Sequence, residues 1–279
     1  MIGIFDSGFG GLTLMKEYLK KYPEFDYVYL GDQANLPYGS RSRENVIELV
    51  KRNVAFLVGQ GCRLIIVACN TASADALREV QKIYQGKPVI LGVLVPAVEA
   101  ALGCTRFGRI GLIATRSTVL SGAYEREILK YAPALYRPKN KRALPKVEVH
   151  SEACPLLVPL IEEGMESHPV TRMMLKKYLR PLKNASVDTL ILGCTHYPLL
   201  QPDIQRIMGK RVWVISSATA ATEALGPYFE RHPELRQALS TGGTRRYLTT
   251  DSPERFSDLG SRFLGRRIRG EKVEICITG

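Results

Sequence analysis

The sequence has no hydrophobic run long enough to cross a membrane. Its longest apolar stretch, residues 89–103, is shorter than the roughly 18 residues that a membrane-spanning helix needs, and Pro96 and Glu99 interrupt it. Residues 1–6 lack both the basic segment and the long apolar segment of a secretory signal peptide. We therefore predict a cytoplasmic protein without a membrane partner.

Motifs for metal and nucleotide binding are also missing. The six cysteines form no Cys-x-x-Cys pair, which argues against a zinc ribbon or a thioredoxin-type site, and we expect mostly reduced thiols. The glycine-rich segment at residues 7–11 is followed by no Gly-Lys-Ser/Thr, and its third glycine does not fit the dinucleotide fingerprint. The sequence thus predicts neither a metal site nor a nucleotide cofactor.

Acidic residues are in the minority, since 27 Asp and Glu accompany 39 Lys and Arg, a net charge of +12. Such an excess raises non-specific affinity for polyanions. The sequence has no basic patch interleaved with aromatic residues and no recognised nucleic-acid motif, so we expect no nucleic-acid partner beyond this non-specific attraction. A non-enzymatic, polyanion-binding or regulatory protein is the alternative that the charge supports.

Short apolar runs alternate with amphipathic stretches along the 279 residues, which can form one large domain or two modest ones. Apolar runs predict strands at residues 2–5, 26–30, 63–68, 88–94, 109–114, 188–192 and 212–215, and helical spacing follows at 12–22, 74–84 and 120–131. Strands this apolar are buried on both faces, so the pattern predicts an α/β fold with parallel sheets. Residues 132–146 are expected to form an exposed basic loop, and residues 247–267 a surface helix.

A weak internal symmetry relates two segments, residues 63–71 and 188–196. Each has an apolar strand, a small residue, a cysteine and then hydrogen-bonding side chains. We expect two similar α/β halves that face each other. Cys69 and Cys194 then stand at the carboxyl ends of parallel strands, where ligands bind in such sheets. Either cysteine alone could be a small core residue, but the matched pair favours an active site.

Two thiols on opposite sides of one carbon atom can remove a proton from one face and return a proton to the other. A free thiol has a pKa of about 8.5, so a modest shift makes it an acid or a base near neutrality. Asp6 could orient or deprotonate Cys69, and His196 could do the same for Cys194. Alternatively, Asp6 is a helix cap or turn residue and His196 a structural histidine.

Two turns could bind a substrate. The backbone N–H groups of residues 7–11 could hold a carboxylate at a helix N-terminus, or the segment could be a tight packing turn. Residues 32–39 could present Tyr38 and backbone amides to a ligand, but the residues alone favour an ordinary surface turn.

Five segments carry a wider similarity: residues 4–12, 31–39, 68–73, 153–162 and 193–200, with the tail at 247–256 in addition. Together they resemble the glutamate racemases, cofactor-independent enzymes that make D-glutamate for bacterial peptidoglycan. The similarity covers nearly the whole chain. It implies an isomerase that uses no cofactor, takes glutamate as its small-molecule substrate and forms a homodimer.

The resemblance also implies two α/β domains with the active site in the cleft between them, residues 1–95 plus 211–279 and residues 96–210. Cys69 would deprotonate D-glutamate with support from Asp6, and Cys194 would deprotonate L-glutamate with support from His196 and Glu162. The residues implied to bind the substrate are Asp6, Ser7, Pro37, Tyr38, Gly39, Asn70, Thr71, Thr195 and His196. The residues alone favour a simpler interpretation of Glu162 and Glu163, as surface charges on a helix.

Two departures from the family pattern stand out. Residues 32–36 read Asp-Gln-Ala-Asn-Leu where the family commonly has Asp-Thr-Ala-Arg, and the segment at 132–146 is longer than expected. A racemase for aspartate or another acidic amino acid is an alternative, because the thiol pair would serve it equally.

Overall fold

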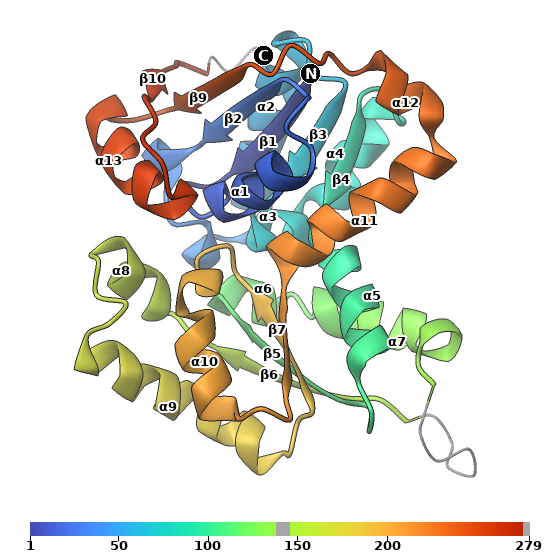
Figure 1. The fold of residues 1–279 in the computed structure, drawn as a ribbon, viewed down its shortest axis with the longest axis vertical. Coiled ribbons are helices and arrows are strands. Elements are labelled where there is room, and N and C mark those ends of the chain that lie inside the picture. The colour runs from blue at the N-terminus through green and yellow to red at the C-terminus, as the bar shows by residue number, and fades with distance from the viewer. Residues whose placement is uncertain (138–145, 276–279) are drawn as a thin grey trace.

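The computed structural model describes residues 1–137 and 146–275, which form two parallel β-sheets with helices packed on their faces (Figure 1). One sheet has six strands and the other four, so the prediction of two parallel-sheet α/β units is confirmed, although the units differ in size. Every strand pair in both sheets is parallel.

The six-stranded sheet takes strands from both ends of the chain. Its order is β10 (Glu271–Lys272), β9 (Arg245–Thr249), β2 (Tyr27–Gly31), β1 (Ile2–Asp6), β3 (Leu64–Val67) and β4 (Val89–Gly92). Every residue of β1, β2 and β3 is buried, as their apolar sequences predict.

The four-stranded sheet comes from one continuous stretch of chain. Its order is β6 (Glu148–Ala153), β5 (Arg109–Ala114), β7 (Thr189–Gly193) and β8 (Trp213–Ser216). The predicted return to the first unit at residue 211 precedes β8, yet β8 pairs with β7 in this sheet. The sheets alone therefore favour a return after Ser216, and the domain limits stay a prediction.

Helices connect the strands. They are α1 (Leu12–Lys21), α2 (Arg43–Gly59), α3 (Asn70–Asp75), α4 (Leu77–Tyr84), α5 (Leu94–Cys104), α6 (Arg116–Leu120), α7 (Ala123–Leu135), α8 (Leu157–Glu162), α9 (Pro169–Asn184), α10 (Gln201–Met208), α11 (Ser217–Arg231), α12 (Pro233–Ala238) and α13 (Pro253–Leu264), with 3₁₀ turns η1 (Gln33–Asn35), η2 (Tyr38–Ser40) and η3 (Tyr197–Leu200).

Three predicted helices need correction. The helix at 74–84 is two helices, because the backbone of Ala76 (φ −125°) leaves the helical region and separates α3 from α4. The helix at 120–131 is likewise interrupted, with Gly122 (φ +60°) between α6 and α7. The prediction of a surface helix at 247–267 is wrong at its start, because Arg245–Thr249 forms β9 and the side chain of Ser252 caps α13.

The predicted basic loop at 132–146 is only partly described. Residues 132–135 belong to the end of α7, and residues 138–145 lie outside the described part.

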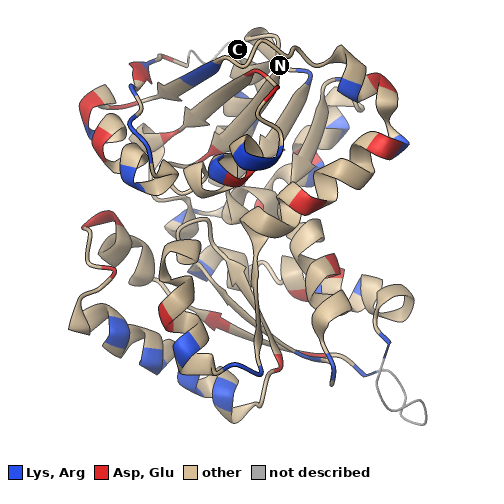
Figure 2. Cartoon of the chain, in the orientation of Figure 1, with Lys and Arg blue, Asp and Glu red and all other residues tan. Residues whose placement is uncertain are grey.

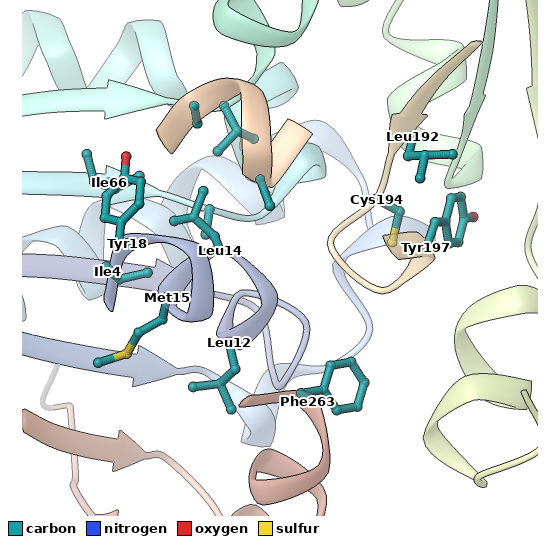
Figure 3. Packing of buried hydrophobic residues seen from close by; sticks show 14 of the residues in the cluster. Ile4, Leu12, Leu14, Met15, Tyr18, Ile66, Leu192, Cys194, Tyr197 and Phe263 are labelled. Atoms are coloured by element: carbon teal, nitrogen blue, oxygen red, sulfur yellow. The ribbon is translucent and has the colours of Figure 1, made fainter. Parts of the chain in front are cut away.

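One continuous cluster of buried apolar side chains joins the two sheets. It contains Ile4 and Ile66 of the larger sheet together with Leu192 of the smaller sheet and Tyr197 of the 3₁₀ turn η3 that follows β7. Figure 3 shows these residues on either side of the region where Phe263 lies. Because the two units share this core, the strand ends of one sheet are held against those of the other.

The strand orders create a crevice in each sheet. The chain leaves β1 for β2 on one side and then returns to β3 on the other, and it leaves β5 for β6 and returns to β7 in the same way. Ligands bind at such reversals, outside the carboxyl ends of the strands. Cys69 follows β3 and Cys194 follows β7, so each thiol stands beside one of these reversals.

The distribution of charge and hydropathy does little to narrow the function. Lys and Arg are distributed over both units (Figure 2), with a row of exposed basic residues on α9. Across residues 1–137 and 146–275, no helix combines the length and the apolarity that crossing a bilayer requires. The same residues include no group of three or more His, Cys, Asp or Glu side chains arranged to hold a metal ion.

Candidate active site

A cavity of about 370 Å³ lies between the carboxyl ends of the two sheets, and both Cys69 and Cys194 line it. The other predicted site residues in its lining are Ser7, Pro37, Tyr38, Gly39, Asn70, Thr71, Glu162, Thr195 and His196. Of the predicted site residues, only Asp6 is absent from this lining, because it is fully buried beneath the cavity wall. The structure thus brings together residues that are up to 189 positions apart.

Cys69 caps the N-terminus of α3. Its sulfur accepts a hydrogen bond from the backbone N–H of Ala72 at 3.5 Å, and its thiol donates to Ser7 Oγ at 3.5 Å. Burial, together with the nearby charge of Asp6, raises the pKa of the Cys69 thiol to about 12. In the absence of a ligand Cys69 is therefore a protonated thiol at neutral pH.

Asp6 joins the two halves of the site. Its carboxylate accepts hydrogen bonds from the backbone N–H of Gly8 at 2.9 Å and from Thr195 Oγ1 at 3.3 Å. Burial raises the pKa of Asp6, while the His196 charge and these hydrogen bonds oppose that shift. The Cys69 thiol donates its hydrogen bond to Ser7, so Asp6 affects Cys69 through its charge, not through a direct hydrogen bond.

His196 lies between Cys194 and Glu162. Its Nδ1 is 3.8 Å from Cys194 Sγ, and its Nε2 is 3.0 Å from Glu162 Oε1. Burial disfavours the charged imidazolium, but the hydrogen bonds to Cys194 and Glu162 outweigh burial and raise the pKa of His196 to about 10. At neutral pH a positive imidazolium therefore stands beside the second thiol, an arrangement that stabilises a thiolate.

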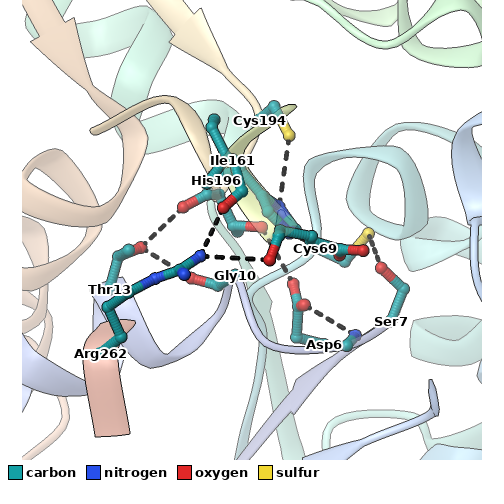
Figure 4. Close-up of polar contacts among 12 residues, drawn as sticks. Asp6, Ser7, Gly10, Thr13, Cys69, Ile161, Cys194, His196 and Arg262 are labelled. Atoms are coloured by element: carbon teal, nitrogen blue, oxygen red, sulfur yellow. Dashed lines mark hydrogen bonds and ion pairs between the residues drawn. The ribbon is translucent and has the colours of Figure 1, made fainter. Parts of the chain in front are cut away.

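The turn after β1 packs directly against the turn that carries Cys194 and His196 (Figure 4). Thr13 donates its hydroxyl proton to the carbonyl oxygens of Gly10 at 2.8 Å and Thr195 at 3.0 Å. A Cβ atom on Gly10 would clash with Thr195 Oγ1 and lie 2.6 Å from His196 Nδ1. A glycine is therefore required at position 10 by this close approach.

Arg262 holds α8 from the other unit. Its guanidinium, on α13, donates to the carbonyl oxygens of Ile161 and Glu162 at the end of α8 (Figure 4). A cation at a helix C-terminus satisfies carbonyl groups that have no partner within the helix. Arg262 thus fixes the segment that carries Glu162, the partner of His196.

The wall formed by residues 37–39 depends on Asp32. The buried Asp32 carboxylate accepts hydrogen bonds from Tyr38 Oη at 2.6 Å, Asn53 Nδ2 at 2.9 Å and Thr250 Oγ1 at 2.9 Å. The Tyr38 hydroxyl is therefore already hydrogen-bonded to Asp32. Tyr38 lines the cavity through its remaining atoms. Residues 32–39, for which the sequence also allowed a surface turn, are anchored in the core through the buried side chains of Asp32 and Tyr38.

Sequence reasoning missed several lining residues. They are Leu36, Ser40, Thr115, Arg116, Cys154, Pro155, Val158, Pro159 and Glu163. Thr115 and Arg116 follow β5 directly, so the same strand-end argument that selected the cysteines could have found them. Cys154 follows β6, whose polar sequence Glu-Val-His-Ser-Glu-Ala hides the strand.

Comparisons with known proteins agree with this geometry. A family model described as Asp/Glu/hydantoin racemase matches residues 12–225. The glutamate racemase of Geobacter metallireducens is 42% identical over 276 residues, covering 99% of this chain and 96% of that protein.

Solved structures give the same result. Glutamate racemase isoform RacE1 from Bacillus anthracis superposes with a TM-score of 0.87 at 34% identity, covering 99% of this chain and 97% of that one. The Francisella tularensis glutamate racemase in complex with D-glutamate gives a TM-score of 0.84 at 33% identity, covering 98% and 97%. These similarities define an isomerase of the amino-acid racemase class. Within that class, the chain belongs to the Asp/Glu/hydantoin racemase family.

Proposed function

We propose that this protein interconverts L-glutamate and D-glutamate by a two-base mechanism in which Cys69 and Cys194 exchange protons with the α-carbon, without a cofactor. The observation that carries the proposal is that these two thiols come from different sheets and line one cavity. The curated and solved relatives named glutamate racemase support the choice of glutamate.

In the L-to-D direction, the Cys194 thiolate removes the α-proton and the Cys69 thiol donates its proton to the opposite face. The raised pKa of Cys69 supports this direction, because it keeps that thiol protonated before the reaction. In the D-to-L direction the roles reverse: Cys69 takes the α-proton and Cys194 supplies one. Each direction leaves the two thiols in exchanged protonation states, and a return of protons through solvent or neighbouring groups restores them.

Neighbouring groups set the two thiols for these roles. His196, held by Glu162, supports a negative charge on Cys194, and Ser7 contributes a hydroxyl beside Cys69. Asp6 acts on the Cys69 side through its charge. We propose that Ser7, Asn70, Thr71, Thr195 and the backbone of residues 37–39 bind the two carboxylates and the ammonium group of the substrate.

The test is an assay of racemisation and of α-hydrogen exchange. Purified protein is mixed with L- or D-glutamate in deuterium oxide without pyridoxal phosphate, and optical rotation and deuterium incorporation are followed. Cys69→Ala and Cys194→Ala should each abolish racemisation, whereas Cys104→Ala, at the C-terminal end of α5 and outside the cavity lining, should not. Wild-type rates in both active-site variants would refute the mechanism.

A serine at either position is informative as well. A hydroxyl is a far weaker acid than a thiol, so Cys69→Ser or Cys194→Ser should lose several kcal/mol of transition-state stabilisation, at about 1.4 kcal/mol for each tenfold loss of rate.

Aspartate is the second candidate substrate, because the thiol pair treats any α-proton alike. The turnover of glutamate and aspartate under identical conditions separates the two. A kcat/KM for aspartate above that for glutamate would reassign the substrate and leave the thiol mechanism unchanged.

We further propose that the enzyme acts in the cytoplasm as a homodimer and supplies D-glutamate for peptidoglycan synthesis. Light scattering coupled to size-exclusion chromatography measures the oligomeric state. Rescue of a D-glutamate auxotroph by the wild-type gene, but not by the Cys69→Ala variant, tests the cellular role.

A further inference from the structure

Both ends of the Asn70 side-chain amide are held by buried hydroxyl groups. Tyr124 Oη donates a hydrogen bond to Asn70 Oδ1 at 2.5 Å, and Asn70 Nδ2 donates to Ser217 Oγ at 3.2 Å. All three residues are at most 2% exposed. Asn70 lines the active-site cavity, whereas Tyr124 and Ser217 stand behind it, outside the lining.

The three residues come from three helices. Asn70 begins α3 immediately after Cys69, Ser217 begins α11, and Tyr124 belongs to α7. The next residue, Thr71, bonds to Thr115 at 2.9 Å and to Thr118 at 3.1 Å. The start of α3 is therefore fixed by contacts with residues that follow β5 of the four-stranded sheet.

A primary amide offers two N–H donors on nitrogen and an acceptor on oxygen. Here the oxygen is engaged by Tyr124 and one N–H is engaged by Ser217, so the remaining N–H is what Asn70 can offer to a ligand in the cavity. Burial raises the pKa of Tyr124, so its phenol stays protonated and continues to donate to Oδ1. Because Tyr124 and Ser217 hold the two ends of the amide, they set the place of the Asn70 side chain at the cavity wall.

We propose that Tyr124 and Ser217 are positioning residues that hold the Asn70 side chain in place at the cavity wall, so that Asn70 presents an N–H donor to a carboxylate of the substrate. This inference rests on the proposed function, because it takes glutamate as the ligand of Asn70. Neither residue lines the cavity, and the hydrogen bonds to Asn70 are the route by which we expect them to act on the substrate.

The test compares KM with kcat for glutamate in Tyr124→Phe, Ser217→Ala and Asn70→Ala. One lost orienting hydrogen bond should raise KM about tenfold while kcat stays within about threefold of wild type. Tyr27→Phe is the matched control, since Tyr27 is equally buried and donates to the Tyr22 carbonyl oxygen at 2.9 Å, at the opposite end of β2 from the cavity. It should lower the melting temperature without changing KM.

A double-mutant cycle distinguishes positioning from general destabilisation. In the Asn70→Ala background, Tyr124→Phe should not raise KM further, because the group that it orients is gone. An unchanged KM in folded Tyr124→Phe, or a full additional increase in the Asn70→Ala background, would overturn the inference. If Tyr124→Phe does not fold, Ser217→Ala and its combination with Asn70→Ala test the same positioning role by the same two criteria.

Failure of the proposed function gives a different result. In that case the wild-type protein does not racemise glutamate, and the inference falls with it. Normal racemisation with a raised KM in Asn70→Ala but not in Tyr124→Phe or Ser217→Ala refutes only the positioning role.

Discussion

Glu162 and His196 form a largely buried pair, with 3.0 Å between Glu162 Oε1 and His196 Nε2. Because the pKa of His196 is raised to about 10 in the folded protein from an ordinary value of 6.5, protonation of His196 stabilises the fold. That contribution is complete below pH 6.5 and is lost as the pH rises toward 10. The melting temperature of the wild type should therefore decline over this range.

Glu162→Gln should weaken this decline, because it removes one of the two partners that hold the proton on His196. Melting temperatures between pH 6 and pH 10 measure the slope. Glu163→Gln is the matched control, since the exposed Glu163 borders the same cavity. Equal slopes in Glu162→Gln and in the wild type would contradict the assignment.

Thr13 should affect catalysis although it lies outside the cavity lining. Thr13→Val keeps the shape of the side chain but removes the hydroxyl donor of the Thr195 carbonyl oxygen, a loss of about 1–3 kcal/mol. The Gly10 carbonyl oxygen still accepts from the backbone N–H of residue 13 at 3.0 Å. We expect kcat/KM for glutamate to fall by about tenfold or more in Thr13→Val and to stay near wild type in Thr13→Ser, which retains the hydroxyl. Similar activities of the valine and serine variants would show that the hydroxyl is dispensable.

A methyl group at position 10 should inactivate the enzyme. Gly10→Ala places a Cβ against Thr195 and His196, so the turn that carries Cys194 must move. Misplacement of a catalytic group by about 1 Å can cost about a hundredfold in rate. Gly103→Ala is the control, because a Cβ on Gly103, in α5, meets nothing within 4 Å. Activity assays and circular dichroism spectra of both variants decide the outcome, and an active Gly10→Ala would refute the prediction.

Arg116 should assist the capture of an acidic substrate. Among the described residues that line the cavity it is the sole Lys or Arg, and it is exposed. Cationic groups at a cleft raise the association rate of anions, and salt screens this effect. Arg116→Gln should lower kcat/KM for glutamate a few-fold at low ionic strength and reduce its salt dependence. Arg180→Gln, on the exposed face of α9, should do neither.

The buried strands were predictable from sequence because apolar runs such as Ile2–Asp6 and Thr189–Gly193 are buried on both faces. The strands that were missed lie toward sheet edges and have polar sequences. Glu148–Ala153 forms the edge of the smaller sheet and Arg245–Thr249 lies next to the edge of the larger, so neither carries the uniform apolar signal.

The residues of the site also differ in whether a local sequence pattern reveals them. Cys69 and Cys194 could be selected because their local sequences match and both follow apolar strands. Tyr124, Ser217 and Thr13 could not, because each lies within or at the start of a helix and contacts the site through residues 54 to 182 positions away. Such contacts follow from the packing of the two sheets and leave no local pattern.

The larger sheet is completed by the end of the chain, since β9 and β10 extend it beyond β2. During synthesis from the N-terminus, the smaller sheet has all its strands once Ser216 has left the ribosome, whereas the larger sheet waits for Lys272. Until β9 has been made, β2 presents an open edge, the kind of surface on which strands of different chains associate. Deletion of the last few dozen residues would therefore expose that edge permanently and impair solubility even though every cavity-lining residue is retained.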